Sequence, residues 1–420
     1  MNRPRFLARW PLTLRGTGAL VLAAACFVLA GELGSLELVY FGCLLTALII
    51  VCLLVLRWGG RVRLTERKIS RETIAVGDVA TVYSEFVLGG AARSGGVQWR
   101  EALSEGLSGE VSGTLSEARG LATPELTYEV RATRRGPHWI GPLSVSITDP
   151  FGIARRTQTV GERTRVLVVP ATVDLDPIDD YTGDLGGAQH SSMDIGQGSD
   201  NLIARPYMPG DSMRRIHWRA TAHHDQLMVR EEERESTPEA TVILDRSGAR
   251  WAPVAFARLG ADPHFEAALT AMVSIVQQLA DDGYLVDVLS ANGTTLVPPI
   301  GGSGTPDEIA ALLRTAAMLM SAREEQLPAL APLFTGGTAG PVVVITGSIG
   351  ADHVDMLRPI AHHSALPILL ACAGPEHSAV PATLDELTRA GWHTAQISPD
   401  GDLAAGWHLA SSKGVARATL

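Results

Sequence analysis

The hydrophobic pattern opens with two apolar runs near the N-terminus. Residues 16–31 read GTGALVLAAACFVLAG and residues 38–56 read LVYFGCLLTALIIVCLLVL, without a charged residue in either. About 18 uncharged apolar residues are enough for a helix to cross a bilayer. The second run meets this length, and the first is marginal but can be extended back through 10–14. The short segment GELGSLE between them predicts a tight turn, so residues 1–60 are expected to form a transmembrane hairpin.

Basic residues flank this hairpin on both sides. Residues 1–71 hold ten Arg or Lys against three Glu, whereas the rest of the chain holds 25 basic against 42 acidic residues. Arg and Lys beside membrane spans are retained on the cytoplasmic side. We therefore expect a protein of the inner cell membrane with two spans, both termini in the cytoplasm and the lipid bilayer as a partner. A cleaved signal peptide for the first run and a buried core helix for the second are the alternatives.

Period-two alternation follows the hairpin. Residues 79–85, 126–132 and 143–148 alternate apolar and polar positions, and Gly and Pro interrupt these runs at short intervals. Such a pattern is typical of antiparallel strands with one buried face. Residues 61–173 are therefore predicted to form a small β-sandwich-like domain. Residues 174–238 begin with a Gly- and Asp-rich linker.

Residues 239–420 change to a longer rhythm. Apolar runs of strand length, such as ATVILD at 240–245 and PVVVITG at 341–347, alternate with amphipathic helical segments. This alternation predicts parallel βαβ units, and hence a doubly wound α/β sheet covered on both faces. Ligands of such sheets bind at the carboxyl ends of the strands, so residues 245–248 and 346–350 are the places to look for a site.

Three stretches of the chain carry a family resemblance. They are RRGPHWIGPLSVSITDPFGIARR at 134–156, RVLVVP at 165–170 and RPYMPGDSMRRIHWRATAHHDQLMVREEERE at 205–235. Together they resemble the bacterial domain-of-unknown-function 58 family, the MoxR-associated membrane proteins. The family signature of Arg, Tyr, Gly-Asp, Arg and Ile-x-Trp before a basic residue is matched by Arg205, Tyr207, Gly210, Asp211, Arg214, Ile216, Trp218 and Arg219. The family commonly has an Arg near the position of His223, so this chain departs from the pattern there.

The resemblance implies a von Willebrand A-like domain over 239–420 and a MoxR-type AAA+ ATPase as partner. It also implies a possible metal-ion-dependent adhesion site, whose first motif is Asp-x-Ser-x-Ser. The sequence DRSGA matches that motif at Asp245 and Ser247, but Ala249 cannot ligate a metal and Gly347 stands where a later acid is expected. Mg²⁺ needs several hard oxygen ligands. We therefore expect no metal here, and we expect the Asp245 carboxylate to cap the turn that follows its strand.

The remaining chemistry favours a binding protein over an enzyme. The charged signature stretch predicts an ion-paired seam between the β-rich and α/β parts, in which Trp218 is packed; a ligand or partner surface is the alternative. Cys372 lies in the apolar run LPILLACAG, where a thiol is usually inert, and Thr305 after the Gly-rich loop is expected to cap a helix.

These observations predict a non-enzymatic, membrane-anchored adaptor or assembly factor with no cofactor. The formal net charge of -10 gives no reason to expect a nucleic-acid partner. A divalent-cation-dependent protein-binding module of the von Willebrand A type is the alternative, and a hydrolase is the third hypothesis. The hydrolase would need a nucleophile beside a base, and the sequence contains no pattern for one.

Overall fold

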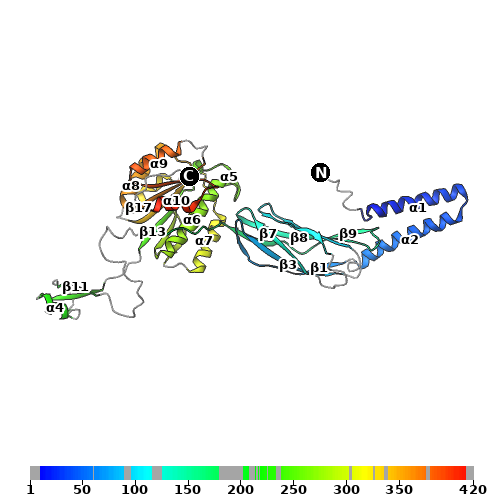
Figure 1. Ribbon diagram of the computed structural model, residues 1–420, viewed down its shortest axis with the longest axis horizontal. Coiled ribbons are helices and arrows are strands. Elements are labelled where there is room, and N and C mark those ends of the chain that lie inside the picture. The colour runs from blue at the N-terminus through cyan, green and yellow to red at the C-terminus, as the bar shows by residue number, and fades with distance from the viewer. Residues whose placement is uncertain are drawn as a thin grey trace. The chain divides into compact units, whose positions relative to one another are not determined.

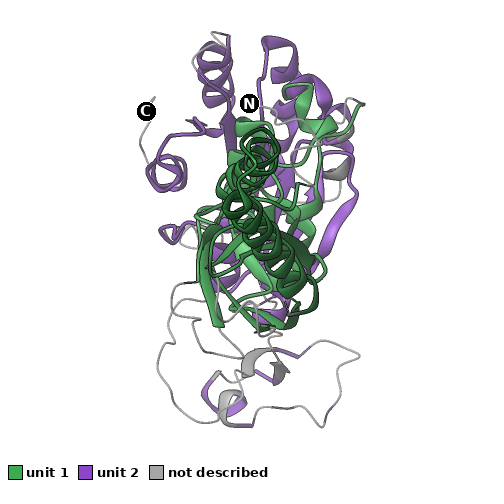
Figure 2. Ribbon diagram, turned by 90° about the vertical axis from the view of Figure 1, so that its right-hand side faces the viewer, with its two compact units in different colours: residues 1–172, 251–273, 310–323 green, residues 173–250, 274–309, 324–420 purple. Residues whose placement is uncertain are grey.

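The chain divides into two compact units that do not follow the sequence order. A computed structural model describes residues 10–59, 61–88, 96–115, 125–178, 202–207, 213, 216, 218–224, 226–232, 238–301, 305–324, 327–334, 339–374 and 379–412. Unit 1 comprises residues 1–172, 251–273 and 310–323, and unit 2 comprises residues 173–250, 274–309 and 324–420 (Figure 2). The division into consecutive segments at 60, 173 and 238 stays a prediction.

Unit 1 begins with two long helices that lie side by side, α1 (Leu14–Leu33) and α2 (Leu36–Gly59) (Figure 1). Gly34 ends α1 in the left-handed conformation, with a φ of 63°, which a glycine adopts without strain and which allows the immediate turn into α2. The buried positions of α1 include the small residues Ala23, Cys26 and Ala30. Close helix–helix approach in a membrane favours small side chains of this kind.

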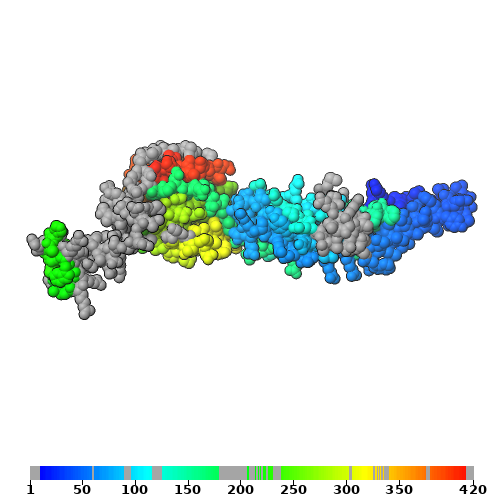
Figure 3. Space-filling model, turned by 60° about the horizontal axis from the view of Figure 1, so that its bottom comes forward, coloured from blue at the N-terminus to red at the C-terminus, as the bar shows by residue number. Residues whose placement is uncertain are grey.

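Both helices are long and apolar enough to cross a membrane, which confirms the length predicted from the sequence. Most of their large apolar side chains are exposed. The helices form the blue end of unit 1, which is continuous with the strands (Figure 3). An exposed apolar surface of this extent is unusual for a helix that faces water. The bilayer placement and the orientation of the termini stay predictions.

Two β-sheets form the rest of the N-terminal part of unit 1. One sheet has the order β1-β3-β7-β5, with bounds β1 (Val62–Ile69), β3 (Val79–Leu88), β7 (Glu125–Ala132) and β5 (Leu107–Ser108). The other has the order β2-β10-β8-β4-β6, with β9 also paired to β8; the bounds are β2 (Thr73–Ala75), β10 (Thr164–Val169), β8 (Gly136–Thr148), β4 (Gly96–Leu103), β6 (Ser112–Thr114) and β9 (Arg155–Val160). The strands predicted from alternation at 79–85, 126–132 and 143–148 are confirmed as parts of β3, β7 and β8.

The buried faces of the two sheets contribute to one hydrophobic cluster. Phe86 and Val130 come from the first sheet, and Leu143, Val145 and Val166 come from the second. Alternate positions of each strand enter this core because successive side chains of a strand point to opposite faces. The opposite face of each sheet is more exposed; it carries many polar side chains but also Val79, Tyr83 and Val87 of β3.

A polar triad is enclosed in this core. Arg67 Nη2 lies 2.9 Å from Glu101 Oε1, and the Tyr128 hydroxyl donates a hydrogen bond to Glu101 Oε2 over 2.8 Å. Burial raises the pKa of Glu101, while Arg67 and the Tyr128 hydrogen bond act in the opposite direction. Burial, together with the Glu101 charge, also raises the pKa of Tyr128. A buried carboxylate is tolerated here because both its oxygens have partners.

The C-terminal part of the chain forms a six-stranded sheet with the order β15-β14-β13-β16-β17-β18. Its strands are β13 (Glu239–Leu244), β14 (Leu285–Ser290), β15 (Thr295–Ile300), β16 (Ala339–Thr346), β17 (Ser364–Cys372) and β18 (His393–Ile397). All neighbours pair in parallel except β14 and β15, which are antiparallel. The parallel sheet was predicted, but the antiparallel edge strand was not.

The helices of this half are α5 (Val254–Ala257), α6 (Pro263–Asp281), α7 (Pro306–Met318), α8 (Val354–His363), α9 (Val380–Arg389) and α10 (Leu403–Ser411). Within unit 2, α8 and α9 bury Leu357 and Leu384 in a cluster with Val344 and Leu369 of the sheet. The alternate positions of these strands point to the opposite face of the sheet. On that face α10 packs against β18, with Gly406 next to Ile397. Helices therefore cover both faces of the sheet in unit 2, as Figure 1 shows for α8, α9 and α10.

A separate strand pair lies within the signature stretch. It consists of β11 (Leu202–Pro206) and β12 (Met228–Glu232), which are antiparallel, with α4 (Trp218–His224) between them in the chain. Thr221 accepts a hydrogen bond from Met228 N over 3.0 Å and so ties α4 to β12.

Candidate functional site

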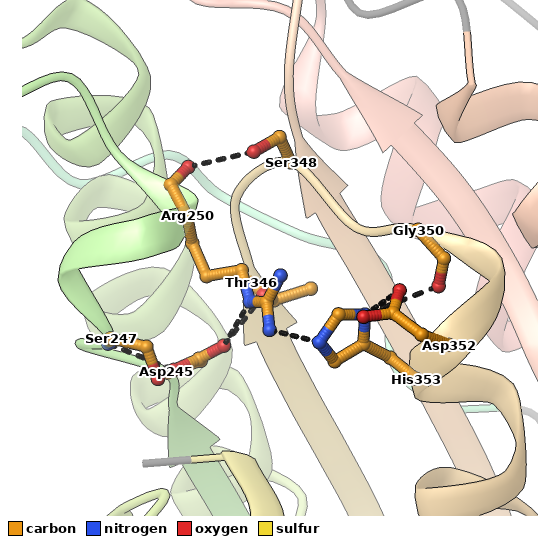
Figure 4. Close-up of polar contacts among 8 residues, drawn as sticks. All are labelled: Asp245, Ser247, Arg250, Thr346, Ser348, Gly350, Asp352 and His353. Carbon is orange, nitrogen blue, oxygen red and sulfur yellow. Dashed lines mark hydrogen bonds and ion pairs between the residues drawn. The ribbon is translucent and has the colours of Figure 1, made fainter. Parts of the chain in front are cut away.

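The strongest polar cluster of unit 2 lies at the carboxyl ends of the neighbouring strands β13 and β16 (Figure 4). Asp245 directly follows β13, and its carboxylate is fully buried. Oδ1 accepts hydrogen bonds from Ser247 N over 2.9 Å and from Ser247 Oγ over 2.5 Å, while Oδ2 accepts one from Thr346 Oγ1 over 2.9 Å. Thr346 is the last residue of β16, so the parallel register of the two strands brings these groups together.

Arg250 brings a positive charge to this carboxylate. It ends the 3-10 helix η4 (Gly248–Arg250), and its Nε lies 3.7 Å from Asp245 Oδ2. Nη2 of the same guanidinium contacts His353 Nε2, and the Arg250 carbonyl accepts a hydrogen bond from Ser348 N over 3.1 Å. The loops after β13 and β16 are therefore joined through both the side chain and the backbone of Arg250 (Figure 4).

His353 completes the cluster from the other side. Its Nδ1 lies 3.2 Å from the Gly350 carbonyl and 2.7 Å from Asp352 Oδ1. His353 is buried, whereas the Asp352 side chain is exposed. The order from the interior to the surface is thus carboxylate, guanidinium, imidazole, carboxylate, so the Arg250 and His353 side chains lie between two acidic groups.

The electrostatics of Asp245 follow from this enclosure. Burial raises the pKa of its carboxyl, and the hydrogen bonds from Ser247 and Thr346 and the charge of Arg250 counteract that effect. A carboxylate without solvent access and with all these partners is held in one place. It can fix the geometry of two loops, but it cannot reach a substrate outside the sheet.

The residues present do not fit a Mg²⁺ ion. Asp245, Ser247 and Thr346 supply three oxygen-bearing side chains, but these are bonded to one another, and a guanidinium lies beside the carboxylate. Ala249 offers no further ligand. Among the described residues, no group of three or more His, Cys, Asp or Glu is placed to hold a metal. Mg²⁺ requires near-octahedral oxygen coordination, which this arrangement does not offer.

Two of the sequence predictions can be checked at strand and helix ends. The Asp245 carboxylate caps the turn after β13 through Ser247 N, which confirms its expected capping role. Thr305 accepts a hydrogen bond from Glu308 N at the start of α7, and Glu308 in turn accepts one from Thr305 N, so the predicted helix cap is confirmed. Cys372 is 1% exposed at the end of β17, and burial raises its pKa to about 12. Its predicted inertness agrees with this environment.

The signature residues are described only in part. Gly210, Asp211 and Arg214 lie outside the described residues, whereas Arg205 lies in β11 and Arg219 in α4. Tyr207 is half-buried and its backbone N donates to the Leu227 carbonyl over 2.7 Å.

The expectation of a packed Trp218 is wrong. Its side chain is 68% exposed at the start of α4, while Ile216 two residues earlier is buried and pairs with Val229. Ile216 therefore lies against β12, whereas the side chain of Trp218 does not pack there.

Sequence reasoning missed Arg250 and His353. Thr346 lies in the segment 346–350 that the sequence predicted as part of a site, because the ends of parallel strands meet at one edge of a sheet. Arg250 and His353 come from loops, and their convergence depends on tertiary packing alone.

Comparison with known proteins identifies the family. Residues 203–382 match the family model described as "Protein of unknown function DUF58". This stretch of the chain belongs to the DUF58 family. The match covers the signature stretch and most of the six-stranded sheet, including Asp245 and Thr346, so the resemblance inferred from the sequence is confirmed.

No curated protein matches the chain. Among solved structures, a point variant of BcpA, the major pilin subunit of Bacillus cereus, is similar at 11% identity over 27% of this chain and 44% of its own, with a TM-score of 0.17. BcpA itself gives 10% identity over 28% and 44%, with a TM-score of 0.16. A Niemann-Pick type C2 protein from the Japanese carpenter ant gives 10% identity over 24% of this chain and 95% of its own, with a TM-score of 0.13. This chain thus spans less than half of the pilins' length, and scores this low carry no inference.

Proposed function

We propose that this protein is a non-enzymatic, membrane-anchored adaptor that presents a DUF58 region to protein partners, foremost a MoxR-type AAA+ ATPase. One observation carries the proposal. The chain combines two helices of membrane-spanning length with an α/β sheet. At the end of one strand of this sheet, the Asp245 carboxylate is buried and accepts hydrogen bonds from Ser247 and Thr346. These two features support an anchor joined to a fixed scaffold.

The membrane arrangement follows from charge. Arg15 lies in the first turn of α1 and Arg57 near the end of α2, whereas Glu32 and Glu37 lie in the helix turns on either side of the connection. This distribution supports a hairpin with both ends in the cytoplasm. The two sheets that share one core support a β-sandwich, and the parallel sheet with Asp245 and Ser247 after a central strand supports a von Willebrand A-like domain.

The chemistry of the described residues supports a binding role over catalysis. Asp245 and Cys372 are inaccessible, and the Cys372 thiol stays protonated at neutral pH because burial raises its pKa to about 12. Nucleophilic catalysis requires a thiolate or a hydroxyl beside a base that a substrate can reach. A scaffold held by hydrogen bonds needs none of these groups.

The second candidate is a divalent-cation-dependent binding module. The observation in its favour is the convergence of three oxygen-bearing side chains, from Asp245, Ser247 and Thr346, on one strand-end position. The observation against it is the Arg250 guanidinium near Asp245, since a metal ion would have to displace this charge. We therefore favour the cation-independent adaptor.

The proposal is tested by affinity purification of the full chain from detergent-extracted membranes, with and without ATP. We expect an AAA+ ATPase of the MoxR type to be retained in one nucleotide state more strongly than in the other. Trp218→Ala is an informative variant because the side chain is exposed, and Trp139→Ala is its matched control because Trp139 is an exposed Trp of a different sheet. Recovery of no such ATPase in either state contradicts the proposal.

A further inference from the structure

A polar groove lies on the outer face of the sheet β2-β10-β8-β4-β6 in unit 1. It has a volume of about 510 Å³ and is lined by Gln98, Trp99, Arg100, Ser112, Gly113, Thr114, Ser144, Ser146, Arg155 and Thr157. Pockets that hold small molecules or headgroups fall in the range of about 300–1,000 Å³. The groove is therefore large enough for a polar headgroup.

Strand register places the groove's side chains in rows across four strands. Thr114, Gln98, Ser146 and Thr157 are successive partners across β6, β4, β8 and β9. Ser112, Arg100 and Ser144 form the next row. Partners in one row face the same side of a sheet. The result is a surface of hydroxyl and amide groups.

The Trp99 side chain lies on the opposite, buried face of this sheet. It is 8% exposed and packs in the core against Tyr128, with ring centroids 5.4 Å apart. The polar groups of the groove therefore come from the alternate positions of the strands, whose side chains face outward.

The charge of the groove is positive. Arg100 and Arg155 are exposed, no Asp or Glu is among the lining residues, and neither guanidinium has an ion-pair partner among the described residues. Arginine binds phosphate with paired N–H donors, and hydroxyl and amide side chains bind the hydroxyls of a ligand. The chemistry that matches this surface is a phosphate ester that also carries free hydroxyls.

One end of the groove is fixed to the base of the helical hairpin. Arg155 N donates to the Pro11 carbonyl over 2.7 Å, and Thr13 N donates to the Ile153 carbonyl over 2.9 Å, immediately before α1 begins. On the other helix, Arg156 Nη1 donates to the carbonyls of Leu56 and Arg57 over 3.0 and 2.9 Å near the end of α2. The start of β9 is therefore held against the ends of both helices.

The base of the hairpin is rich in basic residues. A Cβ at Gly152 would lie 3.5 Å from Arg15 Nη1, so this guanidinium lies beside the loop that leads into β9. Arg57 and Arg156 lie at the neighbouring end of α2. If the hairpin spans the bilayer, these residues and Arg155 lie at headgroup depth, where basic side chains attract anionic lipids.

We propose that this groove binds the headgroup of an anionic phospholipid with free hydroxyls, such as phosphatidylglycerol. Arg155, beside the hairpin, holds the phosphodiester. The hydroxyl and amide row of Gln98, Ser146 and Thr157 binds the headgroup hydroxyls, and Arg100 lies beyond that row. The inference rests on the membrane anchorage proposed above but not on the identity of the protein partner.

The test is a calorimetric titration of the detergent-purified full chain with dihexanoyl phosphatidylglycerol. Parallel titrations use dihexanoyl phosphatidylcholine, which has the phosphodiester without the hydroxyls or the net charge, and inorganic phosphate. We expect phosphatidylglycerol to bind at least tenfold more tightly than either. Arg155→Gln should raise its Kd about tenfold, because it removes the charged hydrogen-bond donor to the phosphodiester. Arg100→Gln should raise the Kd by less, because it removes a positive charge that lies beyond the hydroxyl row. Arg165→Gln, an exposed Arg of β10 outside the groove, is the matched control and should stay within about twofold of wild type.

Three results would overturn the proposal. The first is that the two lipids bind equally tightly. The second is that both groove variants bind phosphatidylglycerol as tightly as wild type does. The third is that inorganic phosphate binds as tightly as phosphatidylglycerol, which would indicate a site for a free anion. Unchanged melting temperatures of the variants ensure that altered binding reflects the groove. ATPase capture and lipid titration of the wild-type chain separate the two proposals. Retained ATPase capture without a preference for phosphatidylglycerol rejects only the lipid site, and a preference for phosphatidylglycerol without ATPase capture rejects only the adaptor.

Discussion

The ion pair between Arg250 and Asp245 is the contact whose removal tests the role of the candidate site most directly. The substitution Arg250→Met keeps much of the apolar stem and removes the charge. The two side chains are 7% and 0% exposed, and Nε lies 3.7 Å from Oδ2. Removing one partner of a buried ion pair costs about 3–5 kcal/mol, because the other charge stays buried alone. Asp245 keeps its hydrogen bonds from Ser247 and Thr346, so we expect the lower end, about 3 kcal/mol.

Amide hydrogen exchange is the suitable assay because it reports on β13 and β16 separately from the rest of the chain. A loss of about 3 kcal/mol in local stability corresponds to exchange roughly a hundredfold faster when exchange is limited by the opening equilibrium. Peptides from β3 and β7 in unit 1 serve as the internal control and should be unaffected.

The pH dependence of this variant has a defined sign. Burial raises the pKa of Asp245 above its unfolded value, so the carboxyl group contributes most to stability below the unfolded pKa of about 3.8 and loses that contribution as pH rises through the folded pKa. Loss of Arg250 raises the folded pKa further. The variant should therefore approach wild-type exchange as pH falls toward about 4 and differ most at neutral pH.

A double-mutant cycle measures whether Arg250 and Asp245 stabilise each other, and so can refute the ion-pair argument. Asp245→Asn removes the negative charge, so the double variant with Arg250→Met leaves no buried ion uncompensated. If the two residues stabilise each other, the double variant is more stable than the sum of the single effects predicts, by about 2 kcal/mol. Additive single effects, or β13 exchange in Arg250→Met within about threefold of wild type, would refute the reasoning.

The remaining predictions concern the metal, the signature and the topology. Millimolar Mg²⁺ should not raise the melting temperature of the full chain relative to EDTA, whereas a ligand at 100 times its Kd would add about 2.7 kcal/mol of stability; a shift that disappears in Asp245→Ala would favour the cation-dependent module. Trp218→Ala should change the free energy of unfolding by less than about 0.5 kcal/mol in chemical denaturation, since the side chain is 68% exposed, and a large loss would restore the packed seam. Reporter fusions at residue 60 and at the C-terminus should be active only with a cytoplasm-dependent reporter, and activity of a periplasm-dependent reporter at either point would reverse the topology.

Local patterns in the sequence predicted the elements that depend on near neighbours. The length and apolarity of the two N-terminal runs predict α1 and α2. The nineteen uncharged residues at 38–56, for example, are by themselves enough to predict a helix of membrane-spanning length. Alternation predicts β3 and β7, and side chains that bond to backbone two or three residues away predict the caps at Asp245 and Thr305. Each of these features is decided within a few residues along the chain, so one sequence contains the information.

The antiparallel edge strand β15 was not predicted from the sequence pattern. β15 contains Pro298 and Pro299, which weaken any strand pattern, since proline lacks a ladder donor and is tolerated mainly at the edge of a sheet. Its antiparallel pairing with β14 follows from the short turn after Ser290, where Gly293 adopts a φ of 82°. The prediction relied on strands that alternate with helices. A hairpin turn needs no crossover helix, so β15 does not follow this pattern.

Only the tertiary structure brought together the groups on which the candidate sites depend. Asp245 and Thr346 are about a hundred positions apart, and their contact exists because β13 and β16 are neighbours in the sheet. The guanidinium of Arg250 lies near Asp245 because the loops after those strands pack on each other. Likewise, Arg100 and Arg155 line one groove because β8 pairs with both β4 and β9. The physical reason is that strand pairing is selected by burial of the whole sheet, so residues that share a site need share no pattern along the chain.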